Sequence, residues 1–332
     1  MKINFVVKNI SLLAISIFST GILFAQTICT GNVTTPRKTD AATKHYLFLQ
    51  KINVSPQKKG AYSDSSQFDL SRMSSRYFNN LKLRAVYIDV PLETFKIDNF
   101  PANSSAQTKA EIDFLKTLAD TGRNKEKVDE SLGFAGVYYR NLAVPGDSDY
   151  VAMRKNLFHM GRQLGDWFAP DSLPQTANLL AKVWQDASYY IWALKFKYNR
   201  IRPYTLDTSL KNITDPYFPA YPSGHSGNSY VAAYVYSELL PDYKNLFVQN
   251  ASDMAFSREI IGVHFPSDSE AGRIFARQFV NLLLQNKQFV AELAKAKLEI
   301  NRVMKTKDIP ADVLSKKSCA KPGTVCNPAS CN

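Results

Sequence analysis

The sequence predicts an all-α protein built as a helical bundle, and three observations support this fold class. From about residue 104, apolar residues recur at the three- and four-residue spacing of amphipathic helices. Prolines and glycines divide this region into segments whose lengths suit single helices. The second half of the chain shows no pair of segments that could form neighbouring strands. With 332 residues, 45% of them hydrophobic, the chain can bury a core of this kind.

Caps and helix-breaking residues place the expected helices. Ser104 and Ser105 can cap the first helix, and Gly122 ends it. The longest helix must end at Pro203, because proline disfavours helical backbone in the residue before it. We therefore expect helices at about 104–122, 125–142, 148–168, 175–201, 223–239, 242–262, 267–285 and 287–305, with a loop at 204–221.

The first 25 residues have the pattern of a signal peptide. Lys2 and Lys8 give a positive start, and the apolar run from Ile10 to Ala25 follows. This run is shorter than the about 20 residues that span a bilayer, which favours cleavage after Ala25 over a membrane anchor. We therefore expect a periplasmic or secreted protein with no membrane span in its mature form.

Composition divides the remainder of the chain. The segment before residue 100 is polar and irregular, except that Val86, Ile88 and Val90 alternate as in a short strand, so strand and helix both stay open there. The last residues are rich in Lys, Pro and Cys. The expected parts are a signal peptide at 1–25, an N-terminal arm and irregular segment at 26–99, a helical domain at 100–305 and a Cys-rich tail at 306–332.

Four cysteines remain after removal of the signal peptide: Cys29, Cys319, Cys326 and Cys331. An exported chain can keep disulfides, and four cysteines allow three connectivities between which sequence cannot choose. A link from Cys29 to the tail is favoured, and pairing within the tail is the alternative. A zinc site is disfavoured, because no histidine lies near any of the four in the sequence.

The formal net charge of +12 points to an anionic partner. Nucleic acid would be one such partner, but no nucleic-acid-binding motif accompanies the charge. A small anionic substrate is the simpler interpretation.

The first candidate motif is a pair of cations, Lys195 and Arg202. They stand seven residues apart, which corresponds to two turns on one face of the expected helix. Two cations at a helix end can grip an oxyanion, and arginine does so with a forked pair of donors. Taken alone, the pair is better explained as a solvated basic face, because Lys197 and Arg200 stand beside it.

The second motif is Pro222-Ser223-Gly224-His225. Ser223 suits a helix cap, and Gly224 leaves the backbone open to a ligand. Free N–H groups at a helix start make an anion site, where His225 could act as a proton donor. The alternative is an ordinary capped turn.

The third motif contains Ser257-Arg258, His264 and Asp268. Gly262 can end a helix so that His264 turns back towards the same site, and Asp268 follows four residues later. A carboxylate at that position can hold the imidazole in one tautomer and stabilise its charged form. Alone, this segment would be interpreted as a surface His–Asp pair.

Together the three motifs predict a phosphoryl-transfer site. Three cations, Lys195, Arg202 and Arg258, match the charge of a transferring phosphoryl group. One histidine can attack and the other can protonate the leaving alcohol, while His45 and His159 have no such partners and are interpreted as ordinary residues. The set contains no metal-binding cluster, so we expect no cofactor.

The combined pattern resembles the type 2 phosphatidic-acid phosphatase superfamily, and within it the bacterial class A non-specific acid phosphatases. Every fixed position of that pattern is present, and the likeness runs from about residue 100 to 305. The resemblance implies a helical bundle of the phosphatase/haloperoxidase type and a metal-independent, secreted phosphatase of broad specificity. The chain departs from the family pattern at Pro219-Ala220, Ser226 and Ile261, and these departures put its substrate range in doubt.

The resemblance also implies roles. His264 corresponds to the nucleophile that forms a phosphohistidine, Asp268 to its partner and His225 to the general acid. The phosphate-binding positions correspond to Lys195, Arg202, Ser223, Gly224 and Arg258. The implied substrates are small phosphorylated molecules such as nucleotides or sugar phosphates. Both a monomer and a homo-oligomer are compatible with the sequence.

Three other functions compete with this one. A vanadium-dependent haloperoxidase would use the same oxyanion cage for halide oxidation. A periplasmic lipid-phosphate or lipid-pyrophosphate phosphatase would share the chemistry, although the lack of membrane spans disfavours it. A binding protein on an inactive scaffold is disfavoured because no signature residue is lost.

Overall fold

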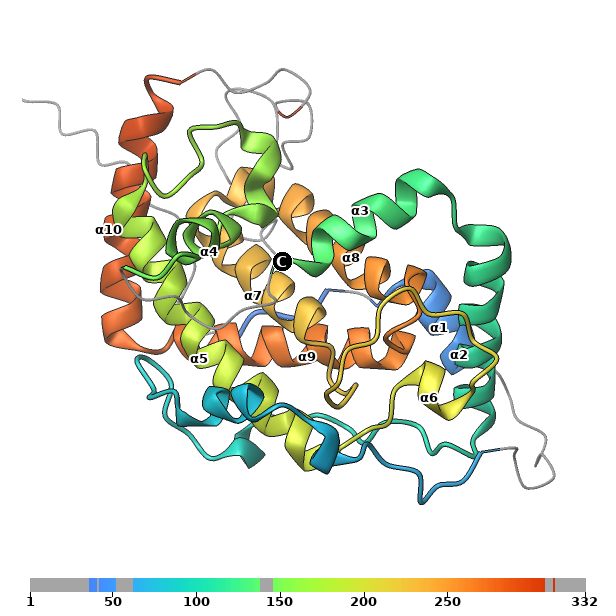
Figure 1. The fold of residues 1–332 in the computed structure, drawn as a ribbon. Coiled ribbons are helices and arrows are strands. Elements are labelled where there is room, and N and C mark those ends of the chain that lie inside the picture. The colour runs from blue at the N-terminus through green and yellow to red at the C-terminus, as the bar shows by residue number, and fades with distance from the viewer. Residues whose placement is uncertain (1–35, 41, 52–61, 138–145, 308–312, 314–332) are drawn as a thin grey trace, which may run out of the picture. The chain divides into compact units, whose positions relative to one another are not determined.

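Ten α-helices and several short 3-10 turns make up the described part of the computed structural model (Figure 1). The described residues are 36–40, 42–51, 62–137, 146–307 and 313, and all belong to the unit Val33–Asn332. The helices are α1 (Lys44–Gln50), α2 (Ala106–Thr117), α3 (Lys125–Ala135), α4 (Tyr150–Asn156), α5 (Pro174–Tyr198), α6 (Pro203–Leu206), α7 (Gly224–Leu239), α8 (Lys244–Ile260), α9 (Pro266–Leu283) and α10 (Lys287–Met304). Within these ranges no strand occurs, so the all-α prediction is confirmed.

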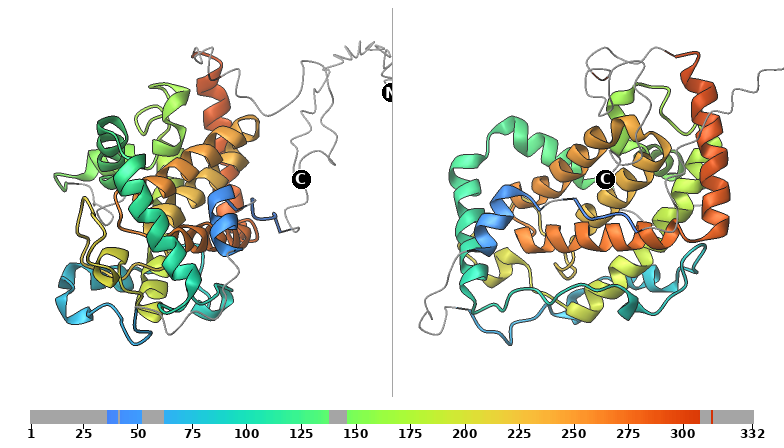
Figure 2. Two further views of the ribbon diagram at one scale, coloured as in Figure 1. Left: turned by 90° about the vertical axis from the view of Figure 1, so that its right-hand side faces the viewer. Right: turned by 180° about the vertical axis from the view of Figure 1, so that it is seen from behind.

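Helix α7 is the centre of the bundle. It packs against α8 and α9 and also contacts α5, while α10 packs along α5. Figure 2 shows α10 on one side of the bundle and α2 and α3 on the other. The arrangement brings the first turns of α7 and α9 and the last turns of α5 and α8 into one region.

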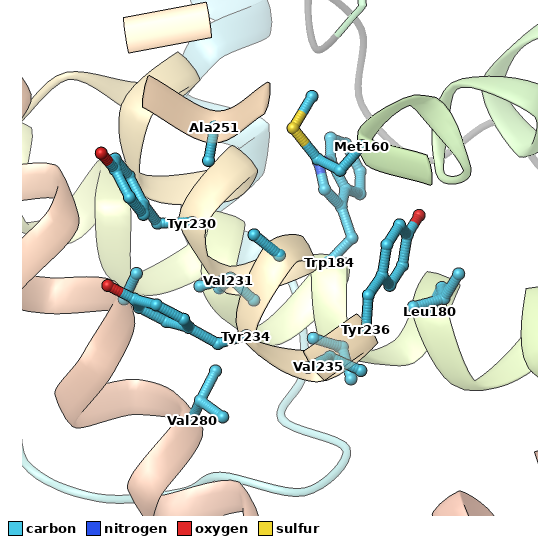
Figure 3. Close-up of a cluster of buried hydrophobic side chains, with 14 of the residues drawn as sticks. Met160, Leu180, Trp184, Tyr230, Val231, Tyr234, Val235, Tyr236, Ala251 and Val280 are labelled. Carbon is cyan, nitrogen blue, oxygen red and sulfur yellow. The ribbon is translucent and has the colours of Figure 1, made fainter. Parts of the chain in front are cut away.

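The sequence of α7 explains its central place. Tyr230, Val231, Tyr234 and Val235 are all buried, so the helix is apolar on most of its circumference (Figure 3). A helix that is hydrophobic all round is stable only when other elements cover it. Each such side chain contributes about 1.5–3 kcal/mol on full burial.

Two glycines let α7 and α9 approach closely. A Cβ atom on Gly272 of α9 would lie 2.8 Å from both the Gly227 nitrogen and the Ser223 carbonyl oxygen of α7. The same approach lets the Ser223 N–H donate to the Asp268 carbonyl oxygen at 2.9 Å. The second and third motifs are therefore joined directly through backbone.

The alternation around Val86 does not produce a strand. The backbone N–H groups of Val86, Tyr87 and Ile88 donate to the Asp186 carboxylate of α5 at 2.7–3.0 Å. These donors are therefore taken by a side chain, and a neighbouring strand is not needed to satisfy them.

The prediction of a single helix at 148–168 is wrong. Helix α4 ends at Asn156, and a 3-10 turn follows at His159–Leu164. Gly161 has non-helical backbone angles, and a Cβ there would lie 2.3 Å from the Phe168 ring. Gly165, with φ of 103°, then reverses the chain.

The long helix also ends earlier than predicted. Helix α5 stops at Tyr198, because Asn199 adopts a left-handed conformation with φ of 48°. Its N–H still closes the helix on the Lys195 carbonyl oxygen at 2.9 Å. Pro203 then starts the short helix α6 inside the expected loop.

Several expectations fall outside the described residues. These include the signal peptide at 1–25 and the four cysteines Cys29, Cys319, Cys326 and Cys331. The bound predicted for the helix at 125–142 is wrong, because α3 ends at Ala135 and a turn follows at Gly136. The arm expected to be irregular contains α1. Among the described residues, no helix has both the length and the apolar character that crossing a membrane requires.

Candidate active site

The three sequence motifs meet where α5 and α8 end and α7 and α9 begin. Lys195 lies in the last turn of α5, whereas Arg202 follows the helix and caps α6 with extended backbone. The spacing predicted that the two cations share one helical face. This is wrong, because Arg202 lies beyond the end of α5. They converge because both donate to the Pro219 carbonyl oxygen, at 2.9 Å from Lys195 and 3.4 Å from Arg202.

His264 is held at both ring nitrogens. Nδ1 lies 3.0 Å from Asp268 Oδ2, and Nε2 lies 3.0 Å from Arg202 Nη1. A guanidinium can only donate hydrogen bonds, so Nε2 must be the acceptor and Nδ1 must carry the ring proton. This tautomer leaves the Nε2 lone pair directed towards the cations.

The surroundings of His264 keep its ring neutral. Burial lowers the pKa of His264 well below its usual value, and Arg202 lowers it further. Asp268 acts in the opposite direction but does not outweigh these two effects. The Nε2 atom of His264 is therefore unprotonated at neutral pH.

Asp268 is ionised and fully buried. Its Oδ1 accepts from Arg200 at 2.6 Å, and its Oδ2 accepts from the Phe265 N–H and from His264. Burial alone would raise the pKa of Asp268, but Arg200 and His264 outweigh it and hold the pKa at about 2.

The turn that carries His264 is determined locally. Helix α8 ends at Ile260, and Gly262 follows with φ of 74°, a value that glycine adopts without strain. Asp268 then accepts the Phe265 N–H at the start of α9, as an acidic residue in a first helical turn can. The same carboxylate therefore caps the helix and orients the imidazole.

Lys195 donates to three backbone carbonyl oxygens of the loop that leads into α7. Its Nζ lies 2.9, 3.0 and 2.7 Å from the oxygens of Pro219, Ala220 and Pro222. Burial lowers the pKa of Lys195 well below its usual value, and Arg202 adds to this effect. An oxyanion bound here would stabilise the charged ammonium group and raise its pKa again.

Arg202 spans the site. It donates to the carbonyl oxygens of Phe218 at 2.9 Å and Val263 at 2.7 Å, besides contacting His264. Its guanidinium lies 4.6 Å from the centre of the Phe218 ring. Burial lowers the pKa of Arg202 to about 10, so it remains charged at neutral and acidic pH.

Helix α3 reaches the other side of the site. The Ala135 carbonyl oxygen accepts from His225 Nε2 at 3.1 Å, and the Ser131 carbonyl oxygen accepts from Arg258 Nη2. Burial and then Arg258 lower the pKa of His225 well below its usual value. Burial likewise lowers the pKa of Arg258, to about 9.

Ser223 caps α7, but its backbone donor is already engaged. Its Oγ accepts from the Ser226 N–H at 3.4 Å, while its own N–H donates to the Asp268 carbonyl oxygen. The amide expected to face an anion at Ser223 is therefore used between helices. Gly224 follows as the first residue of α7.

The structure thus brings the predicted residues into one region, and it adds a group that sequence reasoning missed. Arg200 was grouped with the solvated basic face, yet its side chain is fully buried and bonded to Asp268. Glu111 lies behind it. The signal for Glu111 is its spacing of four and seven residues from Leu115 and Leu118, which puts an acidic residue on an apolar helix face.

The other histidine whose side chain is described is not part of this cluster. His159 packs edge-on against the Phe134 ring, with ring centres 5.3 Å apart. Burial lowers the pKa of His159 to about 4. The side chain of His45 lies outside the described residues.

Comparison with protein families agrees with this geometry. Residues 179–290 match the model of the PAP2 superfamily. This PAP2 segment contains every residue of the three motifs, and the resemblance predicted from them is confirmed.

Curated relatives carry names of the expected kind. A non-specific acid phosphatase of Providencia stuartii is 33% identical over 144 residues, which cover 40% of this chain and 56% of the relative. An acid phosphatase of Zymomonas mobilis is 29% identical, covering 43% and 56%. A non-specific acid phosphatase of Salmonella typhimurium is 31% identical, covering 40% and 55%. The chain thus spans about half the length of the curated relatives it matches.

Among solved structures, a bacterial vanadium-dependent iodoperoxidase is similar, with a TM-score of 0.49 and 19% identity. The match covers 73% of this chain and 64% of the iodoperoxidase.

Proposed function

We propose that this protein is an acid phosphatase that hydrolyses phosphate monoesters through a phosphohistidine on His264, without a metal ion. The observation that carries the proposal is the His264 ring, whose Nε2 accepts from Arg202 while Nδ1 donates to Asp268. The names of the curated relatives support the reaction class.

The first half of the reaction forms the phosphoenzyme. A phosphate monoester occupies the space bordered by Lys195, Arg202 and Arg258, where its oxygens replace some of the present carbonyl contacts. His264 Nε2 attacks phosphorus as the P–O ester bond breaks, and the departing oxygen takes a proton from His225. The imidazole becomes cationic, and Asp268 stabilises it.

The second half releases phosphate. Water attacks the phosphorus of phosphohistidine, and His225, now neutral, accepts a proton from that water. The P–N bond breaks, its electron pair returns to Nε2, and inorganic phosphate leaves. Three cations reduce the cost of the charge on the transition state in both steps.

The distribution of charges supports acid operation. The lowered pKa of His264 keeps the nucleophile neutral as pH falls, and the lowered pKa of His225 means that its acid form requires low pH. The two requirements are met together at a pH above the pKa of His264 and below the pKa of His225. We extend the proposal to a periplasmic or secreted location, which rests on the N-terminal sequence pattern, and to small phosphorylated substrates.

The test is hydrolysis of p-nitrophenyl phosphate, nucleotides, sugar phosphates and lipid phosphates by the purified protein, with and without EDTA. We expect hydrolysis that EDTA leaves intact and vanadate inhibits, since vanadate mimics the five-coordinate transition state. Loss of activity in EDTA, restored by a divalent ion, would contradict the metal-independent mechanism. Oxidation of iodide or bromide by peroxide in the presence of vanadate, without ester hydrolysis, would favour a haloperoxidase.

A further inference from the structure

Glu111 of α2 lies outside the PAP2 segment and yet ends beside the candidate site. Its side chain is fully buried. The carboxylate accepts from the Ser267 N–H at 3.1 Å and from Ser267 Oγ at 2.8 Å, and Arg200 Nη2 lies 3.4 Å away. α2 is therefore tied to the first turn of α9 by a buried carboxyl group.

Arg200 connects this carboxylate to the candidate catalytic pair. Its Nη1 donates to Ser267 Oγ at 2.7 Å and to Asp268 Oδ1 at 2.6 Å. The guanidinium is stacked 3.8 Å from the centre of the Phe265 ring and lies 4.9 Å from that of Phe100. Ring contacts and hydrogen bonds together fix the plane of the guanidinium.

We propose that Glu111 and Arg200 are positioning residues that fix Asp268 so that it orients His264 for attack. The inference deepens the proposed function and rests on it. Arg200 occupies Oδ1 of Asp268, which leaves Oδ2 for His264 Nδ1. Glu111 in turn holds Arg200 and Ser267, and neither Glu111 nor Arg200 is one of the proposed phosphate binders.

The charges of the group fit this role. When Nε2 bears a phosphoryl group and Nδ1 keeps its proton, the imidazole is cationic. Above about pH 7, where Glu111 is ionised, two carboxylates and one guanidinium carry one net negative charge beside that cation. Burial raises the pKa of Glu111 to about 7, and Arg200 limits the rise. Fully buried charges cost free energy, and a gain in the reaction would account for keeping them.

The first test compares Glu111→Gln with wild type at about pH 8, above the raised pKa of Glu111. The substrate is p-nitrophenyl phosphate, whose leaving group needs little proton donation. The amide keeps the shape of the side chain and removes its charge. We expect kcat to fall by about 10- to 100-fold, the effect of losing a charged hydrogen-bond partner. KM and inhibition by inorganic phosphate should change by less than about twofold, because the phosphate-binding side chains are untouched.

Glu299→Gln is the matched control. Glu299 is also buried, and its carboxylate accepts from Gln175 N, Thr176 N and Thr176 Oγ1 at 2.7–2.9 Å, but at the start of α5. We expect it to lower thermal stability without lowering kcat. Equal losses of kcat in both variants would overturn the proposal, because they would show a general cost of disturbing a buried carboxylate.

A second readout does not depend on activity. NMR titration of the His264 ring should show a lower pKa in Glu111→Gln than in wild type, because the amide holds Arg200, and through it Asp268, less firmly. Ser267→Ala, which removes the hydroxyl shared by Glu111 and Arg200, should shift it in the same direction if Glu111→Gln does not fold. An unchanged titration with unchanged kcat would overturn the proposal. A shifted titration in a protein that hydrolyses no ester would refute the proposed function and retain the positioning.

Discussion

At the scale of single residues, the proposed reaction needs the two histidines in opposite protonation states. His264 must be neutral to attack, and the lowered pKa preserves the neutral form as pH falls. His225 must be protonated to act as an acid, and its lowered pKa means that this form is lost as pH rises. In the pH–rate profile, the fall in rate as pH rises should therefore follow the pKa of His225.

Arg258→Gln should move that basic side to higher pH. Arg258 lowers the pKa of His225 by repulsion, so its removal should raise this pKa and extend activity upwards in pH, although kcat/KM falls. The measurement is kcat/KM for p-nitrophenyl phosphate against pH. Arg258→Lys, which keeps the charge, is the control, and an equal shift in both variants would contradict the explanation.

The cations should be unequal in their effect on turnover. Arg202→Ala or Arg258→Ala should lower kcat by about 100-fold or more, as expected when a contact to transition-state charge is lost. Lys197→Ala should have little effect, since Lys197 is substantially exposed and lies near Glu93. Equal losses at Lys197 and Lys195 would contradict the assignment of Lys195 to the site.

At the scale of elements, the site depends on the close crossing of α7 and α9. Gly272→Ala would place a Cβ 2.8 Å from two backbone atoms of α7, which cannot move aside as a side chain can. We expect a loss of about 1–3 kcal/mol in the free energy of unfolding, with reduced kcat because Ser223 and Asp268 are displaced.

Gly133→Ala provides the control for this substitution. Gly133 lies inside α3, and a Cβ there would meet nothing within 4 Å. Alanine should therefore stabilise the protein by about 0.5–1 kcal/mol through its helix propensity. Chemical denaturation of both variants measures the difference, and destabilisation of equal size in both would refute the importance of the crossing.

At the scale of the whole molecule, export and cross-linking are separate from the chemistry of the site. The mature protein should begin near Gln26 and carry two disulfides among its four cysteines. Mass spectrometry of the protein recovered outside the cytoplasm, with and without reductant, measures both. Four free thiols, or a retained N-terminal segment, would contradict this expectation.

The sequence was most informative where local chemistry decides the structure. The Ser223 cap, the break at Gly262 and the His264–Asp268 spacing could each be predicted, because each depends on residues a few positions apart. The end of α5 could not, because Asn199 is stabilised in its left-handed conformation by contacts with the distant Phe68 segment.

Long-range partners account for what the sequence did not predict. Glu111 and Arg200 are 89 residues apart, and nothing local indicates that they pair. The carbonyl oxygens of α3 that accept from His225 and Arg258 are likewise about 90 and 127 residues away. The motifs therefore predicted residues that come together in one region, while the groups that hold them emerged only from the fold.

The most direct measurement of the central claim is the trapping of the phosphoenzyme. Wild type should yield labelled phosphate on His264 after an acid-avoiding quench, and His264→Ala should yield none and hydrolyse no ester. His225→Ala should retain some activity on p-nitrophenyl phosphate, whose leaving group needs little proton donation, and should lose much more on an alkyl phosphate. Label on His225 in wild type, with none on His264, would contradict the account.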